Sequence, residues 1–400
     1  MSSVVSKQIS SYTERASWIR KMFETGMQLK QKHGNDAVFD FSIGNPDLPA
    51  PPAVAEGLRK VLEKAGEPFA FGYIPNAGSP WAREAVARHV EKEQGVSITK
   101  DEIILTCGAA GAINALFRAV LNPGEEVLVP APFFAEYCFY VENFQGVFKT
   151  APTNPDTFDL DLAAMEAAIT PKTKVVLINT PNNPTGQIYS EKTLRELADL
   201  LRRKSAEYGR PILLAADEPY RTLAYDHASV PSLLPLYSHT IVLNSFSKSL
   251  SMAGERIGYV ALSPDMPERQ ELAAAILMTN RILGFVNLPV IGQSIMVAAL
   301  ESKVNVDIYE RRRNLMAKIL EDAGYSFVMP KGGFYFFPKA PGGDDIAFIR
   351  KLQEELVLGV PGTGFGCPGY FRLAFCVDES VIQNAAEGFK KAIRHFEPAK

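Results

Sequence analysis

Between residues 101 and 263 the chain alternates short apolar runs with amphipathic stretches, and this alternation restricts the fold more than any other feature. Short apolar runs suit strands, and the amphipathic stretches between them suit helices. The predicted strands are residues 102–106, 126–129, 174–179, 212–216, 240–244 and 257–262. Strands that alternate with helices predict an α/β domain with a mostly parallel sheet.

One crossover helix is readable between the third and fourth predicted strands. Leucines recur there at helical spacing, at Leu194, Leu197, Leu200 and Leu201. Gly209 and Pro211 then close the segment, so we predict one βαβ unit. In open α/β sheets ligands bind outside the carboxyl ends of the strands, and polar residues that follow strands are therefore candidate site residues.

Three polar clusters follow predicted strands. Residues 179–186 read Asn-Thr-Pro-Asn-Asn-Pro-Thr-Gly, residues 216–220 read Ala-Asp-Glu-Pro-Tyr, and residues 244–258 place Lys248 among serines with Arg256 downstream. A lysine amine forms a Schiff base with a carbonyl compound, and an arginine offers the bidentate geometry that suits phosphate. The clusters predict an amine nucleophile beside a phosphate clamp.

These clusters belong to an ordered series that also contains Ile-Gly-Asn-Pro-Asp at 43–47 and Tyr-Phe-Arg-Leu-Ala-Phe at 370–375. Through this series the chain resembles the class I/II aminotransferases, the fold-type I enzymes that use pyridoxal 5′-phosphate, and is aspartate-aminotransferase-like. The resemblance covers nearly all 400 residues. It implies a large domain, with a mostly parallel sheet flanked by helices, and a smaller α+β domain.

The domain division follows from a change of pattern in the last third of the chain. From about Val290 we expect a long helix through Arg311, Arg312 and Arg313, a strand at 334–337 and a helix near 346–356. Acidic neighbours indicate that the arginine triplet forms a solvated helix face. We predict an N-terminal arm with part of the small domain (1–46), a large cofactor domain (47–289) and a small C-terminal domain (290–400).

The turn that follows the first predicted strand, Cys-Gly-Ala-Ala-Gly at 107–111, leads into a helix start, and helix N-terminal amides bind anions. The resemblance implies that this turn, the side chains of two serines and one arginine hold the phosphate, and that a tyrosine reaches it from the neighbouring subunit of a homodimer. The residues concerned are Gly108, Ala109, Ala110, Ser245, Ser247, Arg256 and, from the second subunit, Tyr73.

The resemblance also assigns the residues around the cofactor ring. Asp217 is expected to keep the ring nitrogen protonated, which lets the ring accept electrons. Tyr220 and Asn183 are expected to donate hydrogen bonds to the phenolic oxygen, and Phe134 to stack on the ring face.

The implied reaction is a ping-pong transfer of an amino group between an L-amino acid and a 2-oxo acid through an aldimine on Lys248. Lys248 serves as anchor and as general base and acid, together with Asp217 and Tyr220 in the catalytic set. Arg372 is expected to grip the substrate α-carboxylate, helped by Gly44 and Asn183.

Side-chain selection stays open. Arg281 and Lys331 are both candidates to receive a second carboxylate. Glutamate with 2-oxoglutarate is one expected pair, and aspartate is a plausible donor. The alternative is a pyridoxal-phosphate-dependent C–S lyase, or another β-eliminating enzyme, on the same scaffold.

Composition excludes several other classes. A net charge of −3 and a pI near 6.1 provide no basic field for nucleic acid or anionic membrane, so small molecules are the expected partners. No stretch approaches the ~18 apolar residues of a membrane span, and we expect a cytoplasmic protein. The four cysteines lack paired spacing and are expected to be reduced, and no metal site is predicted. No G-x-G-x-x-G follows a strand, which argues against an oxidoreductase.

Overall fold

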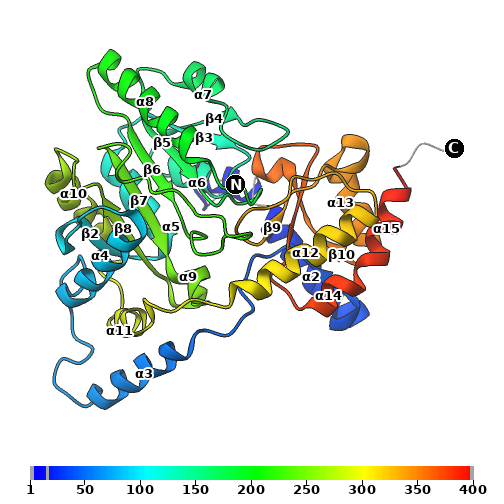
Figure 1. Cartoon of the computed structure of the whole chain (residues 1–400), viewed down its shortest axis with the longest axis horizontal. Coiled ribbons are helices and arrows are strands. Elements are labelled where there is room, and N and C mark those ends of the chain that lie inside the picture. The colour runs from blue at the N-terminus through cyan, green and yellow to red at the C-terminus, as the bar shows by residue number, and fades with distance from the viewer. Residues whose placement is uncertain (1–3, 15–17, 397–400) are drawn as a thin grey trace.

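The computed structural model describes residues 4–14 and 18–396 of the chain. Figure 1 shows a large sheet with helices on both of its faces, and beside it a smaller group of helices and short strands formed largely by the last hundred residues. Within these ranges, no helix has both the length and the apolar character that crossing a bilayer requires.

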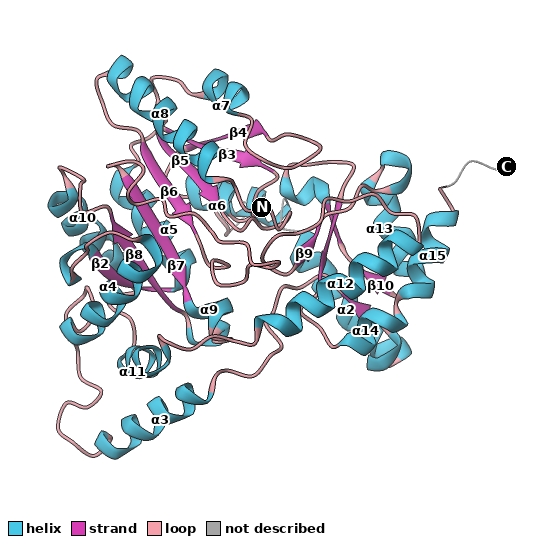
Figure 2. Ribbon diagram, in the orientation of Figure 1, coloured by secondary structure: helices cyan, strands magenta, loops and turns pink. Residues whose placement is uncertain are grey.

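The large sheet has seven strands in the order β2-β8-β7-β6-β5-β3-β4 (Figure 2). Its strands are β2 (Ile103–Cys107), β3 (Glu126–Ala131), β4 (Val147–Pro152), β5 (Thr173–Asn179), β6 (Leu213–Asp217), β7 (Thr240–Ser245) and β8 (Ile257–Leu262). All pairings are parallel except those of β8, which runs antiparallel to β2 and to β7. The six predicted strands are confirmed, and the edge strand β4 was missed because Lys149 and Thr150 interrupt its apolar character.

Both faces of this sheet are buried, as the continuous apolar runs require. Successive side chains of a strand point to opposite faces, so Val175 and Leu177 of β5 join one core while Val176 and Ile178 join the other. Helices cover each of the two cores and contribute residues to them. The polar residues of the strands are left to gather at the strand ends.

The helices around the sheet include the predicted crossover. They are α3 (Pro52–Lys64), α4 (Pro80–Gln94), α5 (Gly108–Val120), α6 (Tyr137–Glu142), α7 (Leu162–Ala168), α8 (Glu191–Tyr208), α9 (Phe246–Ser249), α10 (Arg269–Ile282) and α11 (Val290–Ala299). Helix α8 buries its leucine stripe, begins at Ser190, whose side chain accepts from the Thr193 amide, and ends at Gly209 with left-handed backbone. The βαβ prediction is confirmed.

Helix α1 (Lys7–Glu14) lies against α6, where Tyr12 packs edge-on against Phe139. The remaining elements surround a third, aromatic-rich core. They are α2 (Trp18–His33), β1 (Phe39–Asp40), α12 (Val306–Asp322), β9 (Tyr335–Phe336), α13 (Asp345–Glu354), β10 (Val357–Leu358), β11 (Val360–Pro361), β12 (Phe371–Ala374), α14 (Glu379–Asn384) and α15 (Ala386–Arg394). Strands β11, β12 and β9 form a three-stranded sheet, and β1 pairs in parallel with β10. Phe41 from the start of the chain thus packs in the same core as Phe371 and Phe389.

The arginine triplet of α12 corrects one prediction. Arg311 is exposed, but Arg312 and Arg313 are buried, so the expectation of a solvated face is wrong for two of the three. Arg312 donates to Asp47 at 2.8 Å. Arg313 makes a bidentate pair with Asp226 at 2.7 and 2.9 Å. Burial is tolerated because each guanidinium finds a carboxylate from a distant segment, which the sequence near the triplet does not reveal.

Close approach of β8 to the start of α5 explains one glycine and gives a stability test. A Cβ on Gly258 would lie 2.5 Å from the Gly108 carbonyl carbon and 2.7 Å from the Asn244 oxygen. Gly258→Ala is therefore expected to lower the free energy of unfolding of the apoprotein by about 1–3 kcal/mol, the usual cost of overpacking. Gly254→Ala, where a Cβ meets nothing within 4 Å, is the matched control. Equal urea midpoints for both variants would contradict the packing argument.

Candidate active site

A cavity of about 260 Å³ opens where β5, β6 and β7 end. Among the predicted site residues, all but Gly108, Tyr73 and the two candidates for a second carboxylate, Arg281 and Lys331, line it. The lining comes from the segment before α3, the start of α5, the loop after β3, the three strand ends, and β9 and β12 of the smaller part. Side chains far apart in the sequence thus share one space. Their roles stay predictions.

Lys248 is the reactive group with the most altered environment. It lies in the short helix α9, directly after β7, and its Nζ donates to the Gly44 carbonyl oxygen at 2.8 Å. Burial lowers the pKa of Lys248 from 10.5 to about 8, and the nearby positive charges of Arg372 and Arg256 act in the same direction. The amine is therefore closer to its neutral, nucleophilic form at physiological pH than an exposed lysine is.

Asp217 ends β6 and is buried. Its Oδ2 accepts a hydrogen bond from the Tyr137 hydroxyl, whereas its Oδ1 has no partner among the described residues. Burial raises the pKa of Asp217 to about 7. A buried carboxylate oxygen without a partner is costly, and Asp217 lines the cavity, so the site suits a ligand with a protonated ring nitrogen.

The other end of the cavity is suited to an anion. Gly108 begins α5 with a φ of +70°, and the position of its missing Cβ lies 2.8 Å from Arg256 Nη2, so the guanidinium occupies space that only glycine leaves. Arg256 itself has left-handed backbone at φ 56° and donates through Nη1 to the Ala253 oxygen at 2.8 Å. The helix start, Ser245 and Ser247 bring further donors to the same wall.

Arg372, in β12, is fully enclosed. Its guanidinium carbon lies 4.6 Å from the centroid of the Tyr335 ring and 4.8 Å from that of Phe365. Nη1 donates to Asn183 Oδ1 at 3.1 Å and Nη2 to the Ser42 oxygen at 2.6 Å. The aromatic rings and the two acceptors fix the orientation of a guanidinium whose positive charge has no carboxylate partner among the described residues.

Three predicted residues lie away from this cavity. Tyr73 is 97% exposed, and Arg281 and Lys331 are also on the surface. Tyr73 was expected to act from a second subunit, so its exposure in one chain agrees with that hypothesis without testing it. The cations that line the cavity in the described part of the chain are Lys248, Arg256 and Arg372.

Sequence reasoning missed four polar residues of the site: Tyr137, Tyr140, Asn179 and Tyr335. Asn179 donates to the Asp217 carbonyl oxygen at 2.8 Å and accepts from the Asn183 amide at 2.6 Å, which joins two polar clusters. Its position as the last residue of a strand was a usable signal. Tyr335 shares a hydrogen bond of 3.0 Å with Tyr220, but in sequence it reads as an ordinary apolar strand residue.

Comparisons with known proteins agree with this geometry. Residues 36–389 match the sequence model described as aminotransferase class I and II. The chain is 36% identical to an aminotransferase structure from Eubacterium rectale, with a TM-score of 0.95 over 99% of this chain and all of the other. It is 30% identical to an aspartate aminotransferase of Thermus thermophilus with maleate, with a TM-score of 0.87 over 98% of this chain and all of the other. A probable aspartate/prephenate aminotransferase of Aquifex aeolicus is 32% identical over 90% of this chain and 92% of its own length.

The fold is that of the fold-type I transferases. The chain belongs to the class I and II aminotransferase family, whose members use pyridoxal phosphate as cofactor.

The burial of Lys248 yields a pH-dependent prediction for the apoprotein. The folded-state pKa of Lys248, about 8, lies below the ordinary value of 10.5, so the unfolded state binds the proton more tightly. The buried amine therefore lowers the free energy of unfolding of the wild type at pH values below about 8. Lys248→Met is expected to raise the free energy of unfolding at pH 7 by about 2 kcal/mol, after allowance for the lost hydrogen bond. The gain should shrink between pH 8 and pH 10.5.

Urea unfolding at pH 7 and at pH 10 measures this difference. Lys192→Met, at a lysine that is 84% exposed on α8, is the control and should change stability little at either pH. A Lys248→Met gain that does not depend on pH would contradict the assignment of the penalty to a buried ammonium.

Proposed function

We propose that this protein is a pyridoxal-phosphate-dependent aminotransferase that exchanges an amino group between an L-amino acid and a 2-oxo acid in two half-reactions. The observation that carries the proposal is the sharing of one cavity by Lys248 Nζ, the unpartnered Oδ1 of Asp217 and the enclosed guanidinium of Arg372. An amine, a base for a ring nitrogen and a carboxylate receptor are the groups that amino transfer needs.

Pyridoxal phosphate, when bound, supplies an aldehyde that condenses with amines and a ring that accepts electrons. The residues present fit it: Asp217 lines the cavity with an Oδ1 that has no partner among the described residues and would receive a ring nitrogen, and Arg256 with the start of α5 would receive a phosphate. Gly108, Ala109, Ala110, Ser245, Ser247 and Arg256 would hold the phosphate, and Phe134 would cover the ring face.

Lys248 would act as the anchor and then as the base. Its lowered pKa leaves a usable fraction of neutral amine near pH 7, which suits removal of the proton from the substrate Cα. The Gly44 carbonyl oxygen, 2.8 Å from Nζ, keeps the amine directed into the cavity.

Asp217, Tyr220 and Asn183 would tune the cofactor. Asp217 Oδ1 would hold the proton on the ring nitrogen, while Tyr137 fixes the carboxylate through Oδ2. Tyr220 would donate to the phenolic oxygen, and its hydrogen bond with Tyr335 sets the direction of the hydroxyl. Asn183 is held in place by two hydrogen bonds: its backbone amide donates to Asn179 Oδ1, and its side-chain Oδ1 accepts from Arg372 Nη1.

Arg372 would bind the α-carboxylate that amino acid and oxo acid have in common, assisted by Gly44 and Asn183. We propose glutamate and 2-oxoglutarate as one substrate pair and aspartate as a further donor. The names of relatives in the aspartate and aspartate/prephenate groups support this choice. Arg281 and Lys331 remain candidates for contact with a second carboxylate.

We also propose a homodimer with shared active sites, in which Tyr73 reaches the phosphate of the other subunit. The exposure of Tyr73 at 97% and Phe69 at 92%, on one loop between α3 and α4, supports an interface there. The proposed domains are the arm with part of the small domain (1–46), the large domain (47–289) and the small domain (290–400). The core that joins Phe41 to Phe371 and Phe389 supports the assignment of part of the arm to the small domain.

The reaction is tested with purified protein, pyridoxal phosphate and a panel of L-amino acids, each with 2-oxoglutarate. Glutamate should form with a subset of donors, and Lys248→Ala should abolish its formation because no other amine lines the cavity in the described part of the chain. Lys192→Ala is the matched control. Release of pyruvate and ammonia from cystathionine without an acceptor, with no glutamate formed, would instead establish the C–S lyase alternative.

If Arg372 binds the α-carboxylate, its replacement should impair the reaction of every substrate. Arg372→Lys keeps the charge but loses the bidentate geometry, so kcat/KM should fall about a hundredfold for every amino acid and oxo acid. Arg311→Lys, at an exposed arginine of α12, should leave kcat/KM unchanged. A loss confined to dicarboxylic substrates would show that Arg372 binds the side-chain carboxylate instead.

A further inference from the structure

The turn that carries Asp217 and Tyr220 has a second polar face, away from the cofactor cavity. Residues of this turn alternate: Asp217 and Tyr220 line the active-site cavity, whereas Glu218 and Arg221 line a separate small space behind it. Pro219 borders both spaces. The two faces belong to one short stretch of backbone, so whatever holds the back face also places the front face.

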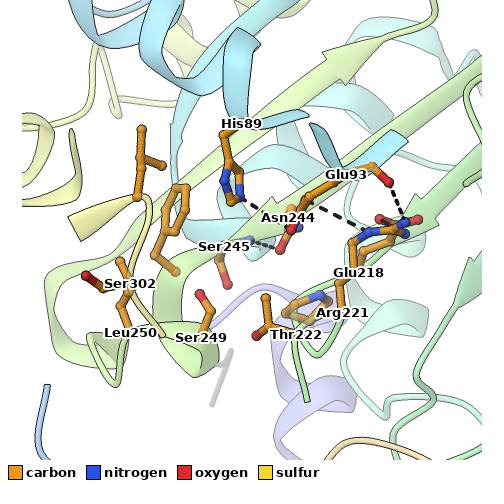
Figure 3. Close-up of a pocket in the computed structure, with 13 residues that line it drawn as sticks. His89, Glu93, Glu218, Arg221, Thr222, Asn244, Ser245, Ser249, Leu250 and Ser302 are labelled. Atoms are coloured by element: carbon orange, nitrogen blue, oxygen red, sulfur yellow. Dashed lines mark hydrogen bonds and ion pairs between the residues drawn. The ribbon is translucent and has the colours of Figure 1, made fainter. Parts of the chain in front are cut away.

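The back face is a buried chain of charged side chains that ends at helix α4. Figure 3 shows Arg221 between Glu218 and Glu93, with His89 beyond Glu93. Arg221 Nη1 donates to Glu218 Oε2 at 2.9 Å, and Arg221 Nε lies 3.9 Å from Glu93 Oε2. Gln94 also donates to Glu218 Oε2, at 3.0 Å. Glu218 is fully buried and its Oε1 has no partner among the described residues.

Backbone acceptors complete the attachment. Arg221 Nη2 donates to the carbonyl oxygens of Glu93 at 3.0 Å and Val230 at 2.9 Å. The Glu218 amide donates to the Leu243 oxygen of β7 at 2.8 Å. The turn is thus fastened to α4, to the loop after β6 and to the strand that precedes Lys248.

This space is too small to be a ligand site. Its volume is about 20 Å³, which exceeds only slightly the ~10–15 Å³ that one water molecule needs. The charged groups around this space can therefore act in two ways: they hold the neighbouring backbone in position, and they create an electrostatic potential.

The network contains more carboxylates than guanidinium groups. Two carboxylates, of Glu93 and Glu218, share the single guanidinium of Arg221, and burial raises the pKa of Glu218 to about 7. The titratable and charged groups that face Glu218 come from its own turn and from α4, β6 and β8: Arg221, Glu93, His89, Asp217 and Tyr259. The negative charge of Glu218 acts on Asp217, because the two carboxylates repel each other and raise the proton affinity of Asp217.

We propose that Glu218 and Arg221 are positioning residues of the aminotransferase reaction: they fasten the turn that presents Asp217 and Tyr220, and Glu218 adds negative potential behind the ring nitrogen of the cofactor. The proposal rests on the proposed function, because it needs a cofactor ring at Asp217. It assigns an electrostatic task to two residues that touch neither cofactor nor substrate.

The test is a pH titration of the absorbance of the cofactor-loaded protein, with thermal unfolding of the apoproteins alongside. Glu218→Gln keeps the size of the side chain and an acceptor for Arg221 but removes the charge. Loss of a nearby negative charge lowers the proton affinity of the bound cofactor, so the titration midpoint should fall by about one pH unit. Glu218→Asp, which keeps the charge, should restore the wild-type midpoint.

Glu93→Gln is the matched control, since it removes the same charge from the same network but from α4 and not from the turn. Its midpoint should move less than that of Glu218→Gln. A folded Glu218→Gln protein with the wild-type midpoint would overturn the proposal, as would a Glu218→Asp shift equal to that of Glu218→Gln. Should Glu218→Gln not fold, an unchanged midpoint in Glu93→Gln together with a lowered one in Glu218→Asp would overturn it. A wild type that binds no pyridoxal phosphate would refute the proposed function itself, which is a different outcome.

Discussion

Burial of both faces of the large sheet is the constraint on which the rest of the structure depends. A strand such as β5 sends Val175 and Leu177 into one core and Val176 and Ile178 into the other, so no position along its middle can carry a polar group. In the central strands β5, β6 and β7 polar side chains are confined to the strand ends, and these parallel strands all end at the same edge. Asn179, Asp217 and Ser245 meet there because the sheet excludes them elsewhere.

The charges of the cavity lining are unequal in number. Lys248, Arg256 and Arg372 face one carboxylate, Asp217, so the described lining is net positive. A phosphate and a substrate carboxylate would offset this excess. The two arginines have different supports, since Arg256 lies against Gly108 whereas Arg372 lies against the rings of Tyr335 and Phe365. Each is therefore held in place independently of the other.

The sequence predicted site residues correctly placed in the cavity wherever a reactive side chain stands at or just after the end of a strand. Asp217 and Lys248 follow apolar runs that can only be buried strands, and the structure brings them into one cavity. Tyr137 and Tyr335 were not predictable, because a tyrosine whose hydroxyl meets a site residue has the same local pattern as a tyrosine of the core. Their partners, Asp217 and Tyr220, lie 80 and 115 residues away.

Long-range pairing explains the errors in the same way. The sequence around α12 suggested a solvated arginine face, yet Arg312 meets Asp47, 265 residues earlier, and Arg313 meets Asp226, 87 residues earlier. The edge strand β4 was missed because Lys149 and Thr150 interrupt its apolar character, and such residues are tolerated there because most side chains of this edge strand are not buried.

The segment from Ser42 to Asp47 connects the two parts of the molecule through the site itself. Its carbonyl oxygens accept from Arg372 at Ser42 and from Lys248 at Gly44, and Asp47 pairs with Arg312 of α12. A Cβ at Gly44 would lie 1.9 Å from the Tyr335 hydroxyl oxygen, so the backbone of the segment lies directly against that tyrosine. Lys248 directly follows strand β7 of the large sheet and Arg372 lies in β12 of the small one, and this segment touches both. A displacement of the smaller part would therefore move Arg372 and the oxygen that accepts from Lys248 together, which would couple the proposed carboxylate receptor to the proposed base.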